Sequence, residues 1–195
     1  MEKLLLTFGC ALLVIWIWFE YFREIPHLEE VGVLKNFRVV SVEPSEATYI
    51  VLEKNFVNPR SGPLYRHSTS VNRGYRDLAY VSNIDVLLAQ PNWSKTMSFH
   101  HDSAKRCYSS EQPLSEEQRL DIVEHTAHFS LIAASEQVAN RIRRIKAGQK
   151  IHLKGDYVQV FNEKDLSEQF LVGIGSDFSS RCQIFRVYDV KQLDD

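Results

Sequence analysis

The strongest constraint on this chain is an uncharged run of 16 residues near its start, from Leu4 to Phe19. As an α-helix it would span roughly 24 Å, and about 28 Å when extended to Phe22. A bilayer core is about 30 Å thick, so the run is a short membrane span that local thinning accommodates. Aromatic residues, which favour the membrane interface, gather at its C-terminal end: Trp16, Trp18, Phe19, Tyr21 and Phe22. We therefore expect a retained N-terminal anchor that binds the membrane through Leu4 to Phe22.

Two alternatives compete with the anchor, namely a cleaved signal peptide and a buried core helix. A signal peptide needs small residues at its cleavage site, whereas Trp and Phe follow the apolar run here. Its positive leading segment would consist of Lys3 and the α-amine, which is a weak one. A core helix is usually apolar on one side, but this run is apolar all round. The anchor is favoured over both.

Outside the anchor about 40% of the residues are hydrophobic, as in an ordinary soluble domain. Hydrophobic residues make up 44% of the whole chain and charged residues 25%, which excludes a disordered or low-complexity polypeptide. The formal net charge of -2 gives no overall field for binding nucleic acid, so nucleic acid is not expected as a partner. We expect an anchor over 1–22, a juxtamembrane connector over 23–35 and a single domain over 36–195.

The domain carries several β-rich runs separated by turn residues. The runs 36–42 and 48–57 flank Pro44-Ser45-Glu46, which predicts a β-hairpin. The run 150–161 is interrupted at Gly155-Asp156, where we expect a bulge. Further strands are expected at 78–88, 95–100, 129–132, 170–174 and 182–190.

Two segments have the features of short helices. Ser115 and Gln118 have the spacing of a capping box, which predicts a helix to about Glu124. Ser135 begins a second helix that Gly148 ends. Its apolar stripe is formed by Val138, Ile142 and Ile145. Strands and helices do not alternate regularly, so we expect an α+β domain whose antiparallel sheet forms a small, partly open β-barrel, preceded by one transmembrane helix.

The cysteines bear on the side of the membrane. Cys10 lies in the anchor, which leaves Cys107 and Cys182 as a pair in the domain. A disulfide closing this loop of about 75 residues would stabilise the fold by roughly 4 kcal/mol. The alternative is two unrelated buried thiols. The few Lys and Arg residues after the anchor favour a cytoplasmic domain, whereas a cysteine pair favours an oxidising compartment. We place the domain in the periplasm.

One stretch resembles a group of membrane-anchored bacterial proteins that have no known activity. Their pattern is HLIPA…V…I..GD.V.LKG.LV, followed by a Ser-rich stretch and a Cys. The matching segments here are 131–134 with Val138, 145–149, 152–158 and 176–182, and the similarity covers about residues 93–190. Ser130 stands where the group has His, and Ala134 stands near its Pro position. The resemblance implies a membrane-anchored protein of the bacterial envelope with a paired cysteine, and it supports no catalytic assignment.

The loop from Asn58 to Arg76 is the candidate binding segment. It has 19 residues and no acidic side chain, and a loop of this length inside a compact domain is often functional. Arg forms bidentate hydrogen bonds with carboxylate and phosphate groups, and Tyr adds a surface for stacking. The alternative is a solvated loop whose arginines pair with acids elsewhere. The candidate residues are Arg60, Arg66, Arg73, Arg76, Tyr65 and Tyr75.

The histidines raise the possibility of a metal site. His125 and His128 have H-x-x-H spacing, and a third ligand from His100 or Asp102 would complete a zinc site. No H-E-x-x-H motif is present, so surface or structural histidines are the favoured reading and we assign no metal. Adjacent side chains of an extended segment point in opposite directions, so at most one of His100 and His101 would serve.

The sequence carries no nucleophile elbow, dinucleotide fingerprint or phosphate-binding P-loop. We expect a non-enzymatic envelope protein without cofactors, whose extracytoplasmic domain binds another envelope component, either a protein or anionic headgroups. One alternative is a metal-assisted hydrolase that uses the histidines. Another is an oligonucleotide-binding barrel on the cytoplasmic side.

Overall fold

The computed structural model describes residues 8–15, 25–30, 33, 36–57, 78–93, 97–163 and 165–193. Residues 8–15 are helical, and the rest of the proposed anchor lies outside the described residues. Among the residues that are described, no helix combines the length and the apolar composition needed to cross a membrane.

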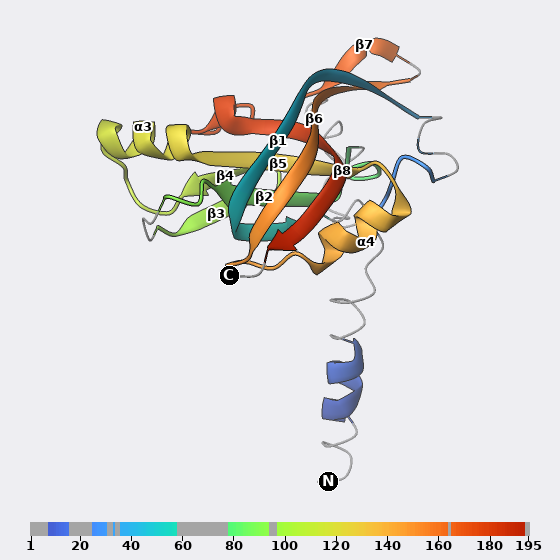
Figure 1. Cartoon of the computed structure of the whole chain (residues 1–195), viewed down its shortest axis with the longest axis horizontal. Helices are drawn as coiled ribbons and strands as arrows, with labels where there is room; N and C mark the ends of the chain where they lie inside the picture. Colours follow the sequence, from blue (N-terminus) through green and yellow to red (C-terminus); the bar gives the residue numbers. More distant parts are fainter. Residues whose placement is uncertain are drawn as a thin grey trace.

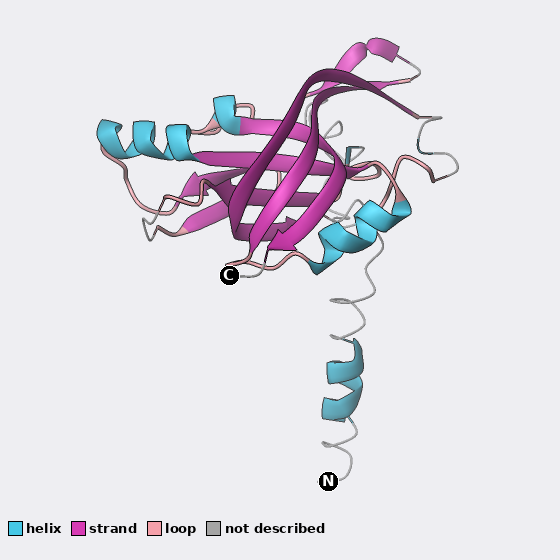
Figure 2. Ribbon diagram, in the orientation of Figure 1, coloured by secondary structure: helices cyan, strands magenta, loops and turns pink. Residues whose placement is uncertain are grey.

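The rest of the described chain is α+β, as expected, with eight strands, two α-helices and a 3-10 helix (Figures 1 and 2). In chain order these elements are β1 (Phe37–Phe56), β2 (Ile84–Ala89), β3 (Phe99–Asp102), β4 (Cys107–Ser110), α3 (Glu116–His125), β5 (Thr126–Ala133), α4 (Glu136–Arg144), β6 (Lys150–Asn162), β7 (Asp165–Phe170), η3 (Ser179–Arg181) and β8 (Cys182–Leu193).

Five strands pair in a ring. The order is β1-β2-β5-β8-β6, and β1 also pairs with β6, so every strand of the ring has a neighbour on each side. β7 pairs antiparallel with the end of β6, and β3 and β4 form a separate hairpin. Figure 1 shows β1, β6 and β8 crossing over β2 and β5. The sheet is mixed rather than antiparallel, because β8 follows α4 and β6 in the chain and returns to β5 in parallel.

The expected hairpin at Pro44-Ser45-Glu46 is wrong. β1 is one strand of 20 residues that pairs with β6 from Phe37 to Ile50, with a register shift between Ser41 and Glu43. Its pairing with β2 begins only at Ile50, so among the described residues β2 forms no backbone hydrogen bond with position 44. A proline, which has no N–H, is therefore accommodated without interrupting the strand.

Both expected helices are confirmed, and both begin at the expected caps, but α4 ends at Arg144 with Ile145 as its C-cap, before the expected Gly148. α3 begins with a full capping box, in which Ser115 and Gln118 satisfy each other's backbone N–H groups. α4 buries Val138 and Ile142. Gly148 follows it with φ +83°, a conformation that a glycine adopts without steric cost.

The bulge expected in β6 is also present. The register against β8 shifts between Lys154 and Gly155. A Cβ atom at Gly155 would lie 2.0 Å from the carbonyl oxygen of Arg186, so only a glycine allows the strands to approach this closely. The glycines of the last connection, Gly173 and Gly175, form a turn at positive φ rather than extending a strand.

Candidate functional site

The strands β2 and β5 are buried on both their inner and their outer faces. Alternate residues of each strand point into the ring and out of it. The inward residues Ile84, Val86, Leu88, Phe129 and Leu131 share one core with Val138 and Ile142 of α4. The outward set is also buried, because the β3–β4 hairpin and α3 lie on it. We call the segment 97–125, which contains the hairpin and α3, the cover.

A charged pair lies between the cover and the ring. The Asp85 carboxylate, on the outer side of β2, accepts two hydrogen bonds from the Arg106 guanidinium, from Nε at 2.6 Å and from Nη2 at 2.6 Å. Both side chains are buried, with 2% and 0% of their surface exposed. A bidentate ion pair of this kind fixes the orientation of the hairpin as well as its distance from β2.

Two further groups complete the bonding of this carboxylate. The Ser130 hydroxyl of β5 donates to Oδ1 at 2.6 Å, and His101 Nε2 lies 2.8 Å from Oδ2. Burial alone would raise the pKa of Asp85, but the charge of Arg106 and the hydrogen bonds from His101 and Arg106 outweigh it and hold this pKa well below its usual range. Asp85 is therefore ionised, with Arg106, Ser130 and His101 as its partners, whereas Nη1 of Arg106 is buried without a hydrogen-bond partner.

The backbone at Arg106 is shaped to deliver its side chain. Arg106 has φ 55°, in the left-handed region, which costs a residue with a side chain on the order of 1 kcal/mol. It closes the turn between β3 and β4, in which Asp102 Oδ1 accepts hydrogen bonds from the N–H groups of Ala104 and Lys105. This left-handed residue comes directly before Cys107, so one turn supplies both the arginine and a cysteine to the ring.

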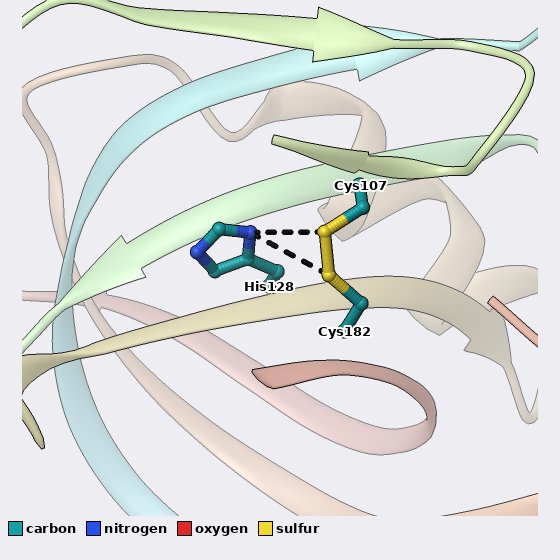
Figure 3. A group of neighbouring side chains, drawn as sticks. All are labelled: Cys107, His128 and Cys182. Atoms are coloured by element: carbon teal, nitrogen blue, oxygen red, sulfur yellow. Dashed lines mark hydrogen bonds between the residues drawn. A yellow bond between two sulfur atoms is a disulfide. The ribbon is translucent and has the colours of Figure 1, made fainter. Parts of the chain in front are cut away.

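A disulfide joins the cover to the ring beside the charged pair. Cys107 of β4 is bonded to Cys182, the first residue of β8, and both are buried (Figure 3). The pairing expected from the cysteine count is confirmed. Because Cys182 lies opposite His128 in the β5–β8 pairing, the disulfide lies over the same outer face as Asp85.

His128 faces the disulfide. Its Nδ1 lies 3.6 Å from the sulfur of Cys107 and 3.8 Å from that of Cys182. Figure 3 shows the imidazole facing both sulfur atoms. Nδ1 also accepts the Tyr108 backbone N–H at 3.3 Å, so in the neutral ring the proton is on Nε2. Burial, and to a lesser degree the charges of Arg181 and His101, lower the pKa of His128 to about 3. The imidazole is therefore neutral at physiological pH, and its Nδ1 lies close to both sulfur atoms while accepting the Tyr108 N–H.

The turn before β8 completes this region. The Ser176 hydroxyl lies 3.3 Å from the Cys107 sulfur and 3.9 Å from the Cys182 sulfur. A Cβ atom at Gly173 would lie 2.5 Å from the Cys182 Cβ, so a glycine is required for the turn to pass the disulfide. The Gly173 N–H donates to the Lys105 carbonyl at 2.6 Å, which ties the turn to the tip of the cover.

The structure places the candidate histidines apart. His100 is exposed on β3, whereas its neighbour His101 turns inward to Asp85, so adjacent histidines do point in opposite directions. His125, at the end of α3, lies against Asp121. Within the described residues, the one set of three side chains suited to a metal ion is Cys107, His128 and Cys182. The arginines and tyrosines of the loop 58–76 lie outside the described residues.

Asp85, Arg106 and Ser130 were missed as members of a site. Asp85 carries the one sequence signal that points to it, because it is the single charged residue in the apolar run 84–89. An acid in a buried strand needs a cationic partner. Which cation pairs with it depends on how the hairpin folds back, and the sequence gives no local indication of that.

A comparison with protein-family models, curated proteins and solved structures found no match to this chain.

Proposed function

We propose that this chain is a non-enzymatic binding domain, tethered by its N-terminal apolar segment on the outer side of a bacterial inner membrane, that binds an anionic envelope component through the loop 58–76. The observation that carries the proposal is the closed outer face of β2 and β5. The cover buries this face, and the Cys107–Cys182 disulfide and the Asp85–Arg106 pair hold the cover in place.

The ring order supports a binding role. Five strands in the order β1-β2-β5-β8-β6, with β5 parallel to β8 and α4 between β5 and β6, resemble the oligonucleotide-binding barrel. Such barrels bind ligands on the face of their second and third strands and with the loops around it. The second and third strands of this ring are β2 and β5, whose outer face is covered. This speaks against the oligonucleotide-binding alternative and leaves the loops as the contact.

The loop that joins β1 to β2 is the candidate segment, because it occupies the position of a ligand-binding loop in such barrels and carries four arginines without an acid. Arginine clusters near a membrane bind anionic headgroups or acidic protein surfaces. The disulfide supports the extracytoplasmic side, since disulfides persist in oxidising compartments.

Charge reversal tests the loop. In the full chain, purified from membranes in mild detergent, Arg66→Glu with Arg73→Glu is expected to weaken recovery of the partner, or binding to phosphatidylglycerol vesicles, by at least about tenfold. Arg144→Glu with Lys146→Glu is the matched control, because it makes the same charge change at two exposed positions, the last residue of α4 and the turn after it. Unchanged binding in the loop variant, with an intact circular dichroism spectrum and disulfide, would reject the loop as the contact.

A further inference from the structure

We propose that Cys107, His128 and Cys182 form a binding site for a thiophilic divalent metal ion of the zinc type when the disulfide is reduced. This inference is independent of the proposed binding loop, because Cys107 belongs to the cover and His128 and Cys182 lie on the ring strands beneath it. They come from three different strands, β4, β5 and β8. Their donor atoms lie within 4.8 Å of one another, and all three residues are buried.

The distances already match two edges of a tetrahedral site. Zinc bonds to sulfur at about 2.3 Å and to imidazole nitrogen at about 2.1 Å, which places sulfur and nitrogen about 3.6 Å apart around the ion. The two Nδ1-to-sulfur distances are 3.6 and 3.8 Å. The imidazole needs no rearrangement, and the ion would replace the Tyr108 N–H, which lies 3.3 Å from Nδ1.

The sulfur–sulfur edge requires reduction. In a tetrahedral site two thiolates lie about 3.8 Å apart, so the S–S bond must be broken first. A dithiol supplies two electrons and two protons and becomes a disulfide, whereas a phosphine supplies two electrons and takes the oxygen of one water molecule, whose two protons go to the sulfur atoms, and becomes a phosphine oxide; in both cases the S–S bond breaks and two S–H bonds form. The metal ion then displaces both thiol protons to solvent and binds two thiolates. The two Cα atoms are 5.7 Å apart, so rotation of the side chains is enough to separate the sulfur atoms.

The fourth position faces the turn before β8. The Ser176 hydroxyl lies near both sulfur atoms, at 3.3 and 3.9 Å, and would act as a ligand or hold a water molecule there. Ser176 is half-buried, and its neighbours Gly175 and Asp177 are exposed, which gives an ion a short route from solvent. With a water molecule in this position, the ion would have three protein ligands and one solvent ligand.

Cobalt titration tests the site directly. The full chain with Cys10→Ser is reduced with a phosphine under nitrogen, and Co²⁺ is added in mild detergent. We expect one equivalent to bind with a sulfur-to-cobalt charge-transfer band in the near ultraviolet and intense visible bands of tetrahedral cobalt, and we expect Zn²⁺ to abolish both. The disulfide form, from the same preparation without reductant, is expected to give neither band.

Variants separate this site from general metal binding. His128→Asn keeps an oxygen that accepts the Tyr108 N–H, and is expected to weaken Co²⁺ binding at least about tenfold and shift the visible bands. His125→Asn, at the surface end of α3, is the matched control and is expected to leave binding unchanged. The proposal is overturned if the reduced protein keeps its native near-ultraviolet circular dichroism spectrum but binds no Co²⁺ at one equivalent. It is also overturned if reduction abolishes the native spectrum, or if the His128→Asn variant binds Co²⁺ as tightly as the parent does.

Discussion

Arg106→Met is expected to lower the free energy of unfolding by about 3–5 kcal/mol, because it leaves the Asp85 carboxylate charged and buried without its main partner. Urea unfolding of the full chain, followed by far-ultraviolet circular dichroism, measures this loss. The matched control is Arg119→Met on α3. Arg119 and its partner Asp177 are 46% and 63% exposed, so this change is expected to cost no more than about 1 kcal/mol.

A second variant separates the lost charge pair from lost packing. Asp85→Asn combined with Arg106→Met removes both charges and keeps an amide oxygen that accepts from Ser130. We expect the double variant to be more stable than Arg106→Met alone, because the uncompensated charge is gone. A double variant that is less stable than Arg106→Met would show that the pair is not the main contact between cover and ring.

The Asp85–Arg106 pair also determines how the stability of the fold changes at acid pH. The pKa of Asp85 is lower in the folded state than its value of 3.8 in a model compound. Its contribution to stability is therefore fully present above pH 3.8 and is lost as the pH falls below that value. The stability difference between the parent and the double variant is expected to narrow below pH 3.8.

Cys107→Ser with Cys182→Ser is expected to cost about 4 kcal/mol, since the disulfide closes a separation of 75 residues. The measurement is again urea unfolding, in a Cys10→Ser background that serves as the reference because Cys10 is exposed. Hydrogen exchange is expected to rise mainly in the cover, because the disulfide links β4 directly to β8. A loss below about 1 kcal/mol, or exchange that rises equally over the whole ring, would contradict this role.

Features determined by neighbouring residues could be predicted from the sequence. The Ser115 capping box and the stripe of α4 depend on spacings of three and four residues, and both helices are where they were expected. The cysteine pair followed from a count of thiols. The bulge at Gly155 followed from a glycine inside an apolar run, although the reason for it, the Arg186 carbonyl, lies on another strand.

Features determined by distant pairing could not be predicted. Pro44 has the local character of a turn residue, yet it lies within one continuous strand because β2 joins β1 only later in the chain. The parallel pairing of β5 with β8 depends on where the chain returns after β6. The partnership of Asp85 with Arg106 depends on the cover folding onto β2 and β5, which leaves no periodic pattern in the sequence.

The Cys107–Cys182 disulfide joins the cover to the ring, and we propose that it forms in an extracytoplasmic compartment. Acid quenching of bacterial cells that express the full chain, followed by alkylation without reduction and mass spectrometry of the peptides, tests it most directly. We predict that the Cys107 and Cys182 peptides are recovered joined and that Cys10 is alkylated. Recovery of Cys107 and Cys182 as two alkylated thiols would contradict the account.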